Sequence, residues 1–233
     1  MKLTRNRLDF GDVYAGFGAP VVPIDCGRIC APHNPSGKPF CCDICCAVPV
    51  AYQAEWKYLR QHTSLWHAWR GDECEREPGN RAELEQQTPA HLRLMACAGP
   101  DRCERDFRAV SCRQFPFFPY ITPDFRFIGM TYDWEFRGTC WVISHLDQVT
   151  ADYRREFFNT YDRIFETWLE DFDSYVELSE EVRAHYMFKR KRIPLLHRNG
   201  CDYLVSPASG GMRKAAAGSF PRFLPYTTSA AAP

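Results

Sequence analysis

The stretch Cys26-Gly27-Arg28-Ile29-Cys30 is followed, after a proline-rich loop, by Cys41-Cys42-Asp43-Ile44-Cys45-Cys46. Half of the 12 cysteines of the chain therefore lie in one short segment. Thiolates at this density are held together either by disulfides or by a soft metal, such as Zn²⁺, Cu(I) or the iron of an iron–sulfur cluster. The choice between these two linkages decides how this part of the chain folds.

The loop between the two halves of this segment contains Pro32, Pro35, Gly37 and Pro39. Three prolines remove backbone donors and restrict the chain to conformations that exclude a helix or a central strand. Because the backbone supplies no regular hydrogen-bond ladder here, we expect a metal to organise the loop.

A second group of cysteines follows later in the chain. It consists of Cys97, Cys103 and Cys112, with Cys140 after a Gly-Thr turn. A four-thiolate zinc site and a [4Fe–4S] cluster each need four ligands, usually supplied by loops. Vicinal cysteines rarely both bind one Zn²⁺, so the pairs in the first group favour a cluster of several metal atoms or the use of one partner per pair. The remaining Cys74 and Cys201 stand apart and are expected to be inert thiols.

Composition and charge limit the partners and the compartment. The chain of 233 residues has 29 basic and 29 acidic residues, so no net charge attracts nucleic acid or an anionic membrane. We interpret the basic run 189–192 as a solvated helix end. No membrane-spanning stretch or signal peptide is evident. We therefore expect a cytoplasmic protein, in whose reducing compartment clustered cysteines bind metal or act in redox chemistry.

Hydrophobic spacing predicts a mainly α fold with a few short strands (α+β), in which cysteine-rich metal-binding loops pack against helices. Helices are expected over about 51–66, 80–95, 150–175 and 179–189, and short strands over about 125–143 and 193–205. The rigid aromatic run 115–121 suits packing around a site better than a sheet interior. The helix 150–175 carries an apolar stripe that should be buried, formed by Tyr153, Phe157, Tyr161, Ile164 or Phe165, Trp168, Phe172 and Tyr175.

The cysteine groups, the predicted helices and the composition of the tail divide the chain into four regions. They are an irregular N-terminal segment (1–25), a cysteine-cluster metal-binding region (26–143), a helical region with a C-terminal hairpin (144–206) and a disordered tail (207–233).

Two motifs suggest a family. The first cysteine group runs into Ala47-Val48-Pro49-Val50 and a helix containing Glu55, and the second contains Cys103, Arg108 and Cys112-Arg113-Gln114-Phe115-Pro116. Together they resemble the zinc- or iron-chelating CxxCxxCC (YkgJ-like) family, whose signature C…RPxxCRxFP is similar to the second motif. The resemblance covers about residues 26–143. The chain departs from the family in its Cys26-x3-Cys30 spacing and in Ala109, which replaces a proline.

Clustering and resemblance together predict a metal site that draws on both groups. The candidate ligands are Cys26, Cys30, Cys41, Cys42, Cys45, Cys46, Cys97, Cys103, Cys112 and Cys140. The number of thiolates favours a [4Fe–4S] cluster, with zinc as the alternative. Arg108 and Arg113 could form ordinary salt bridges or offset the charge of the thiolates. We favour the second role for Arg113, which lies beside Cys112.

Three functions remain open. The first is a metal-binding protein whose iron–sulfur cluster or zinc has a structural or redox role. The second is an enzyme, because flagellin lysine N-methylases resemble this cysteine family and combine such a cluster with methyl transfer from S-adenosylmethionine to a protein substrate. The third is a metal-handling or interaction module with a protein partner. Motifs of common hydrolases, kinases and dinucleotide enzymes are missing from the sequence.

Overall fold

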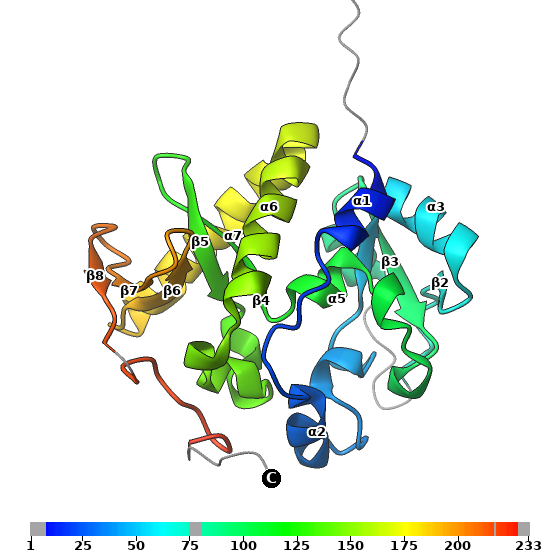
Figure 1. Cartoon of the computed structure of the whole chain (residues 1–233), viewed down its shortest axis with the longest axis horizontal. Helices are drawn as coiled ribbons and strands as arrows, with labels where there is room; N and C mark the ends of the chain where they lie inside the picture. Colours follow the sequence, from blue (N-terminus) through cyan, green and yellow to red (C-terminus); the bar gives the residue numbers. More distant parts are fainter. Residues whose placement is uncertain (1–7, 75–80, 217, 228–233) are drawn as a thin grey trace, which may run out of the picture. The chain divides into compact units, whose positions relative to one another are not determined.

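The computed structural model describes residues 8–74, 81–216 and 218–227 (Figure 1). These residues form two compact units. The first, the cysteine unit, takes residues 10–15 and 25–115. The second, the five-stranded unit, takes residues 8–9, 16–24 and those from 116 onward. The expected boundary at residue 143 differs from this division.

The expectation of a mainly α chain with minor strands is wrong. Over the described residues the fold is α+β, with 44% of them in helices and 17% in strands, and they form antiparallel sheets of three and five strands. The stretch expected as a helix to residue 95 shows the reason. Its helical part ends before Pro89, and the apolar residues that follow it form a strand, Leu92–Cys97. Residue 80 of that expected helix lies outside the described residues.

The cysteine unit is built on its three-stranded sheet, with the strand order β1-β3-β2. Its strands are β1 (Val50–Tyr52), β2 (Trp66–Ala68) and β3 (Leu92–Cys97). Its α-helices are α1 (Phe10–Ala15), α2 (Cys26–Cys30), α3 (Gln53–His62), α4 (Arg81–Gln87) and α5 (Val110–Gln114). Short 3-10 helices cover Ala31–His33, Phe40–Cys42, Pro100–Arg102 and Arg105–Phe107. The cysteines of both groups thus lie on short helices, loops and the end of the central strand.

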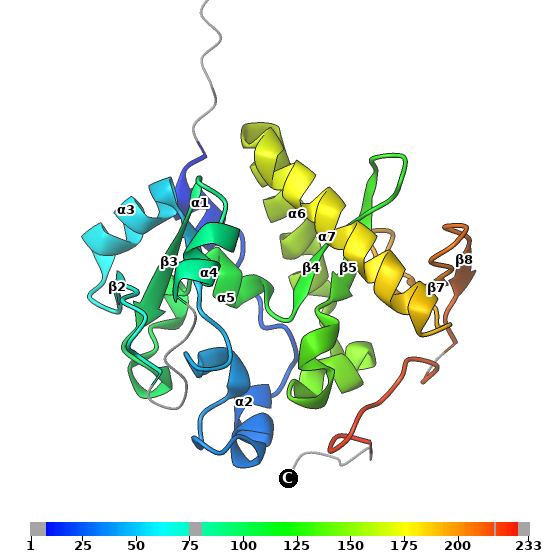
Figure 2. The ribbon, with the colours of Figure 1, turned by 180° about the vertical axis from the view of Figure 1, so that it is seen from behind.

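The five-stranded unit has the strand order β4-β5-β6-β7-β8. Its strands are β4 (Phe117–Ile121), β5 (Phe127–Tyr132), β6 (Ile193–His197), β7 (Asp202–Val205) and β8 (Met212–Lys214). Its α-helices are α6 (Ala151–Thr167) and α7 (Leu169–Phe188), and 3-10 helices cover Trp134–Gly138, Trp141–Ser144 and Leu146–Gln148. Figure 2 shows α7 lying across the sheet, where Val182 and Tyr186 pack with Phe118, Ile193 and Leu195.

The aromatic run 115–121 is part of this sheet, contrary to expectation. All of β4 is buried, and Pro119 is tolerated because β4 lies at the edge of the sheet. Helix α7 provides hydrogen-bond partners for the backbone at the end of β4. The Ile121 N–H donates to Ser179 Oγ at 2.9 Å, and Arg183 Nη1 donates to the Ile121 carbonyl at 2.8 Å.

The long helix expected over 150–175 is divided into α6 and α7. Thr150 begins α6 by accepting a hydrogen bond from the Tyr153 N–H, and the extended backbone of Trp168 ends it. Tyr153 and Phe157 are fully buried, as expected, whereas Phe165 is only partly buried. The aromatic stripe is therefore deepest in the first half of α6.

The hairpin expected over 193–205 is confirmed by β6 and β7, and Gly200 adopts φ +82° in its turn. The tail is more ordered than expected within the described residues. Strand β8 pairs with β7, and the buried Tyr226 donates a hydrogen bond to the Thr139 carbonyl at 3.1 Å. Residue 217 and residues 228–233 of the tail, like residues 1–7, lie outside the described residues. Across the described parts of the chain, no helix is long and apolar enough to cross a bilayer.

Candidate metal centre

Helix α2 places the first two cysteines together. The Asp25 side chain accepts a hydrogen bond from the Gly27 N–H at the start of this helix. A spacing of four residues puts Cys26 and Cys30 on the same helix face. Burial, and after it the charge of the neighbouring Cys30, raise the pKa of Cys26 to about 11. The unusual Cys-x3-Cys spacing is therefore the spacing of one helical turn.

The loop after α2 is organised by hydrogen bonds from its own side chains. Asp43 is buried, and one of its oxygens accepts hydrogen bonds from Asn34 Nδ2 at 3.0 Å and Ser36 Oγ at 2.8 Å. The other oxygen accepts from the Cys45 N–H at 3.0 Å. Asn34 also donates to the Lys38 carbonyl at 2.9 Å. The expectation that a metal must organise this loop is wrong, because these polar side chains already fix its path.

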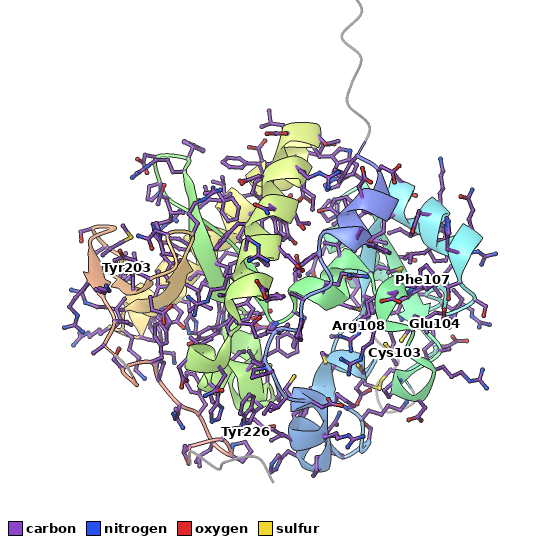
Figure 3. The ribbon with its side chains drawn as sticks, in the orientation of Figure 1. Cys103, Glu104, Phe107, Arg108, Tyr203 and Tyr226 are labelled. Carbon is purple, nitrogen blue, oxygen red and sulfur yellow. A yellow bond between two sulfur atoms is a disulfide. The ribbon has the colours of Figure 1, made fainter. Side chains whose placement is uncertain are left out.

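The second cysteine group lies on a loop that neighbouring elements anchor. Thr63 Oγ1, just after α3, donates to the Glu104 carboxylate at 2.7 Å. The indole N–H of Trp66, in β2, donates to the Phe107 carbonyl at 2.8 Å. Figure 3 labels the residues of this stretch, Cys103, Glu104, Phe107 and Arg108. Two hydrogen bonds, to Glu104 and to Phe107, thus hold the loop that carries Cys103.

Arg113 holds the same loop from within. Its guanidinium is buried and donates to the carbonyls of Arg108 at 2.8 Å and Asp106 at 2.7 Å. It also lies 4.4 Å from the ring centroid of Tyr14. We expected Arg113 to offset thiolate charge, but these contacts make it an anchor of the loop backbone.

Arg108 is the cation that contacts sulfur. Its Nε donates a hydrogen bond to Cys103 Sγ at 3.5 Å, and the two side chains lie side by side in Figure 3. Burial lowers the pKa of Arg108, but the hydrogen bond to Cys103 and the charges of Cys103, Cys42 and Cys112 together raise it above its usual value. One guanidinium therefore interacts with cysteines of both sequence groups.

Four cysteines interact with one another around this arginine. Burial and then the charges of Cys42 and Cys97 raise the pKa of Cys112. Burial also raises the pKa of Cys97, to which Cys42 and Cys103 add, although a hydrogen bond from the Gly99 backbone opposes the shift. The charge of one thiolate raises the pKa of another thiol only when the two sulfurs are near each other. The fold thus brings Cys42, from the first group, to the three cysteines of the second.

Cys42 differs from its neighbours in how readily it ionises. Its sulfur lies 3.9 Å from that of Cys41, and the hydrogen bond from Cys41 lowers the pKa of Cys42 to about 7, with help from Arg108. Burial raises the pKa values of Cys30 and Cys97 instead. Cys42 therefore becomes a thiolate at lower pH than Cys97 and Cys112.

Glu55 is a buried residue of this unit to which the sequence analysis gave no role. One of its carboxylate oxygens accepts hydrogen bonds from Tyr14 Oη and the Val110 N–H, each at 2.7 Å. The other accepts from the Tyr52 N–H at 3.2 Å. Burial raises the pKa of Glu55 to about 7 against the effect of these donors. A glutamate in the first turn of α3 was visible in the sequence, but its burial against α1 and α5 was not.

The disulfide Cys45–Cys74 was not expected. Cys74 was interpreted as an isolated thiol and Cys45 as a metal ligand, yet their Cα atoms lie 5.0 Å apart and their sulfurs are bonded. A tight turn brings Cys74 into place, since the Glu73 carboxylate accepts the N–H groups of Arg70 and Gly71, each at 2.8 Å. In this structure Cys45 therefore has no thiolate to offer a metal.

The remaining expected ligands occupy different places. Cys41 and Cys46 are partly buried in the cysteine unit. Cys140 is buried in the five-stranded unit, and Cys201 lies on the β6–β7 hairpin of that unit. As the side chains stand, no three His, Cys, Asp or Glu residues of the described ranges form a group that could hold a metal ion.

Comparison with known proteins adds no relative. No protein-family model matches the chain, and no curated protein or solved structure is significantly similar to it. The likeness to the CxxCxxCC family therefore rests on the two sequence motifs alone.

Proposed function

We propose that the cysteine unit binds a metal centre through Cys42, Cys97, Cys103 and Cys112, with a [4Fe–4S] cluster preferred over zinc. The observation that carries the proposal is that Arg108 donates to Cys103, while the charges of Cys42, Cys97 and Cys103 act on neighbouring thiols and raise the pKa values of Cys97 and Cys112. Four thiolates are the number that either centre requires. The function is then structural or electron-transferring metal binding.

The protonation of the thiols supports a metal. Burial keeps Cys97 and Cys112 protonated near neutral pH, because their pKa values are raised. A bound cation reverses this preference, since it stabilises thiolates and releases their protons. Arg108 would then offset part of the negative charge that four thiolates bring. The sulfurs must draw closer together than they stand, which requires the loop that carries Cys103 and the short 3-10 helix that carries Cys42 to move.

Residues around the four cysteines suit a metal centre that is shielded from solvent. When bound, an iron–sulfur cluster supplies one-electron chemistry whose potential depends on hydrogen bonds and burial around the sulfurs. The Gly99 backbone already donates toward Cys97, and Arg108 donates to Cys103. Cys26 and Cys30 are further free thiols of this unit. A cytoplasmic location belongs to the proposal, because a reducing compartment keeps these cysteines available to a metal.

The experiment is elemental analysis of protein purified without oxygen. We expect brown protein with about four iron and four sulfide per chain, and thiols that resist alkylation until the metal is removed. Colourless protein with stoichiometric zinc would support the proposed site, with zinc in place of the iron–sulfur cluster. Less than about 0.3 metal per chain, with every reduced thiol open to alkylation, would contradict the proposal.

A further inference from the structure

The C-terminal end of α7 exposes apolar side chains next to a basic run. Phe188 is 82% exposed and Met187 is 52% exposed. The four basic residues 189–192 that follow are all exposed. A favourable interaction with the helix dipole accounts for cations in the last turn, but it gives no reason for an exposed phenylalanine beside them.

Strand β8 brings more residues of the same kind to this place. Met212 is 47% exposed, and Arg213 and Lys214 are exposed beside it. Arg192 Nη1 donates to the Gly211 carbonyl at 3.4 Å, which joins the end of α7 to the start of β8. Figure 2 shows the end of α7 beside β7 and β8. Met212 and Lys214 pair with Val205 and Tyr203, which pack in the core with α7, so these two residues lie on the same sheet face as α7.

We propose that this basic–apolar surface binds an anionic lipid membrane. It is formed by Met187, Phe188, Lys189, Arg190, Lys191, Arg192, Met212 and Lys214. None of its cations forms an ion pair with a described carboxylate, so their charge is available to a partner. Basic side chains attract the anionic headgroups of a membrane, and exposed apolar side chains enter the interface below them.

The apolar residues favour lipid over other anionic partners. Single-stranded nucleic acid stacks its bases on aromatic faces, but methionines offer none, and Lys189 Nζ already lies 5.4 Å from the centroid of the Phe188 ring. A protein partner would need a pocket for a side chain that protrudes as far as Phe188. A bilayer interface accepts protruding phenylalanine and methionine wherever cations surround them. The expectation that the chain has no membrane partner came from its balanced net charge, which hides this local excess.

The test is co-sedimentation of the full chain with vesicles of phosphatidylcholine alone or mixed with phosphatidylserine. We expect binding to the mixed vesicles only, weakened at least tenfold by high salt. Lys214→Gln should weaken binding severalfold, because β8 contributes this cation to the surface. Phe188→Ser should weaken it too, whereas Phe125→Ser, at another exposed phenylalanine of the same unit, should not.

Three results would overturn the proposal. The first is equal binding to both kinds of vesicle, or to neither. The second is unchanged binding by the β8 variant and by Phe188→Ser, with both proteins shown to be folded by circular dichroism. The third is a preference for a single-stranded oligonucleotide or polyglutamate over the mixed vesicles at equal charge concentration, which would assign the surface to a different partner.

Discussion

The guanidinium of Arg108 donates to Cys103 and interacts with Cys42 and Cys112. If these thiolates hold a metal, removing the cation leaves their negative charge less compensated. We predict that Arg108→Gln releases metal to a chelator about 10–100 times more readily than the unmodified protein. Arg102→Gln is the matched control, because Arg102 is exposed on the same loop. Equal release by the two variants would show that Arg108 has no part in holding the metal.

The pKa values of Cys42 and Cys26 predict different reactivity in metal-free protein. At pH 7 about half of Cys42 is thiolate, because its pKa is about 7, whereas Cys26, with a pKa of about 11, is almost entirely protonated. Iodoacetamide should therefore modify Cys42 well before Cys26, as followed by peptide mass spectrometry. Cys41→Ala removes the hydrogen bond to Cys42 and should slow its modification. Equal rates at the two sites would contradict this order.

Glu55 predicts a pH dependence of stability. The folded protein keeps a proton on Glu55 up to a pKa of about 7, whereas the unfolded chain loses it near 4.5. The free energy of unfolding should therefore fall by up to about 3 kcal/mol as pH rises between these values, and then level off. Urea unfolding of the protein and of Glu55→Gln measures the difference. The variant should lack this slope, and identical slopes would assign the titration elsewhere.

At the scale of residues, the sequence predicts which types matter but not which of them meet. Both cysteine groups and the motif around Cys112 are evident without a structure. Whether Arg108 or Arg113 contacts sulfur depends on the path of the loop that ends at Arg108, which long-range anchors such as Trp66 fix. The disulfide between Cys45 and Cys74 joins residues that are 29 positions apart, and no local sequence pattern indicates such a pairing.

Among the elements, α6 offers the clearest test of packing. Phe157 is fully buried, whereas Phe165, two turns later, is partly buried. Phe157→Ala should lower the free energy of unfolding by about 3–5 kcal/mol, because it leaves a cavity among aromatic rings. Phe165→Ala should cost about 1–3 kcal/mol. Chemical denaturation measures both, and a larger loss at Phe165 would contradict the burial described for this helix.

Helices proved easier to predict than strands for a physical reason. The 3.6-residue period of α6 repeats often enough to be recognised, and the Thr150 cap marks its start. Strands β1, β2 and β8 contain three residues each, too few for an alternating pattern to be visible. Strand β4 carries Pro119, which argues against a strand unless its position at the edge is known. The sheets were therefore underestimated.

At the scale of the whole molecule, the division into units depends on contacts far apart in the sequence. Residues 16–24 join the five-stranded unit although residues before and after them belong to the cysteine unit. Their anchors lie on and next to α6. The Ala19 N–H donates to Glu156 at 2.7 Å, and the Thr150 N–H donates to the Val21 carbonyl at 3.0 Å. Sequence composition does not predict such pairings, so the expected boundary followed the last clustered cysteine.

The central claim is that cysteines of both groups hold one metal centre, and Cys112 tests it most directly. Metal and sulfide should be measured in anaerobically purified Cys112→Ser and in Cys201→Ser, whose substituted residue lies on a hairpin of the five-stranded unit. We predict that Cys112→Ser loses most of its metal, because it removes one of four ligands, while Cys201→Ser keeps the full content. Equal metal content in the two folded variants would contradict the claim.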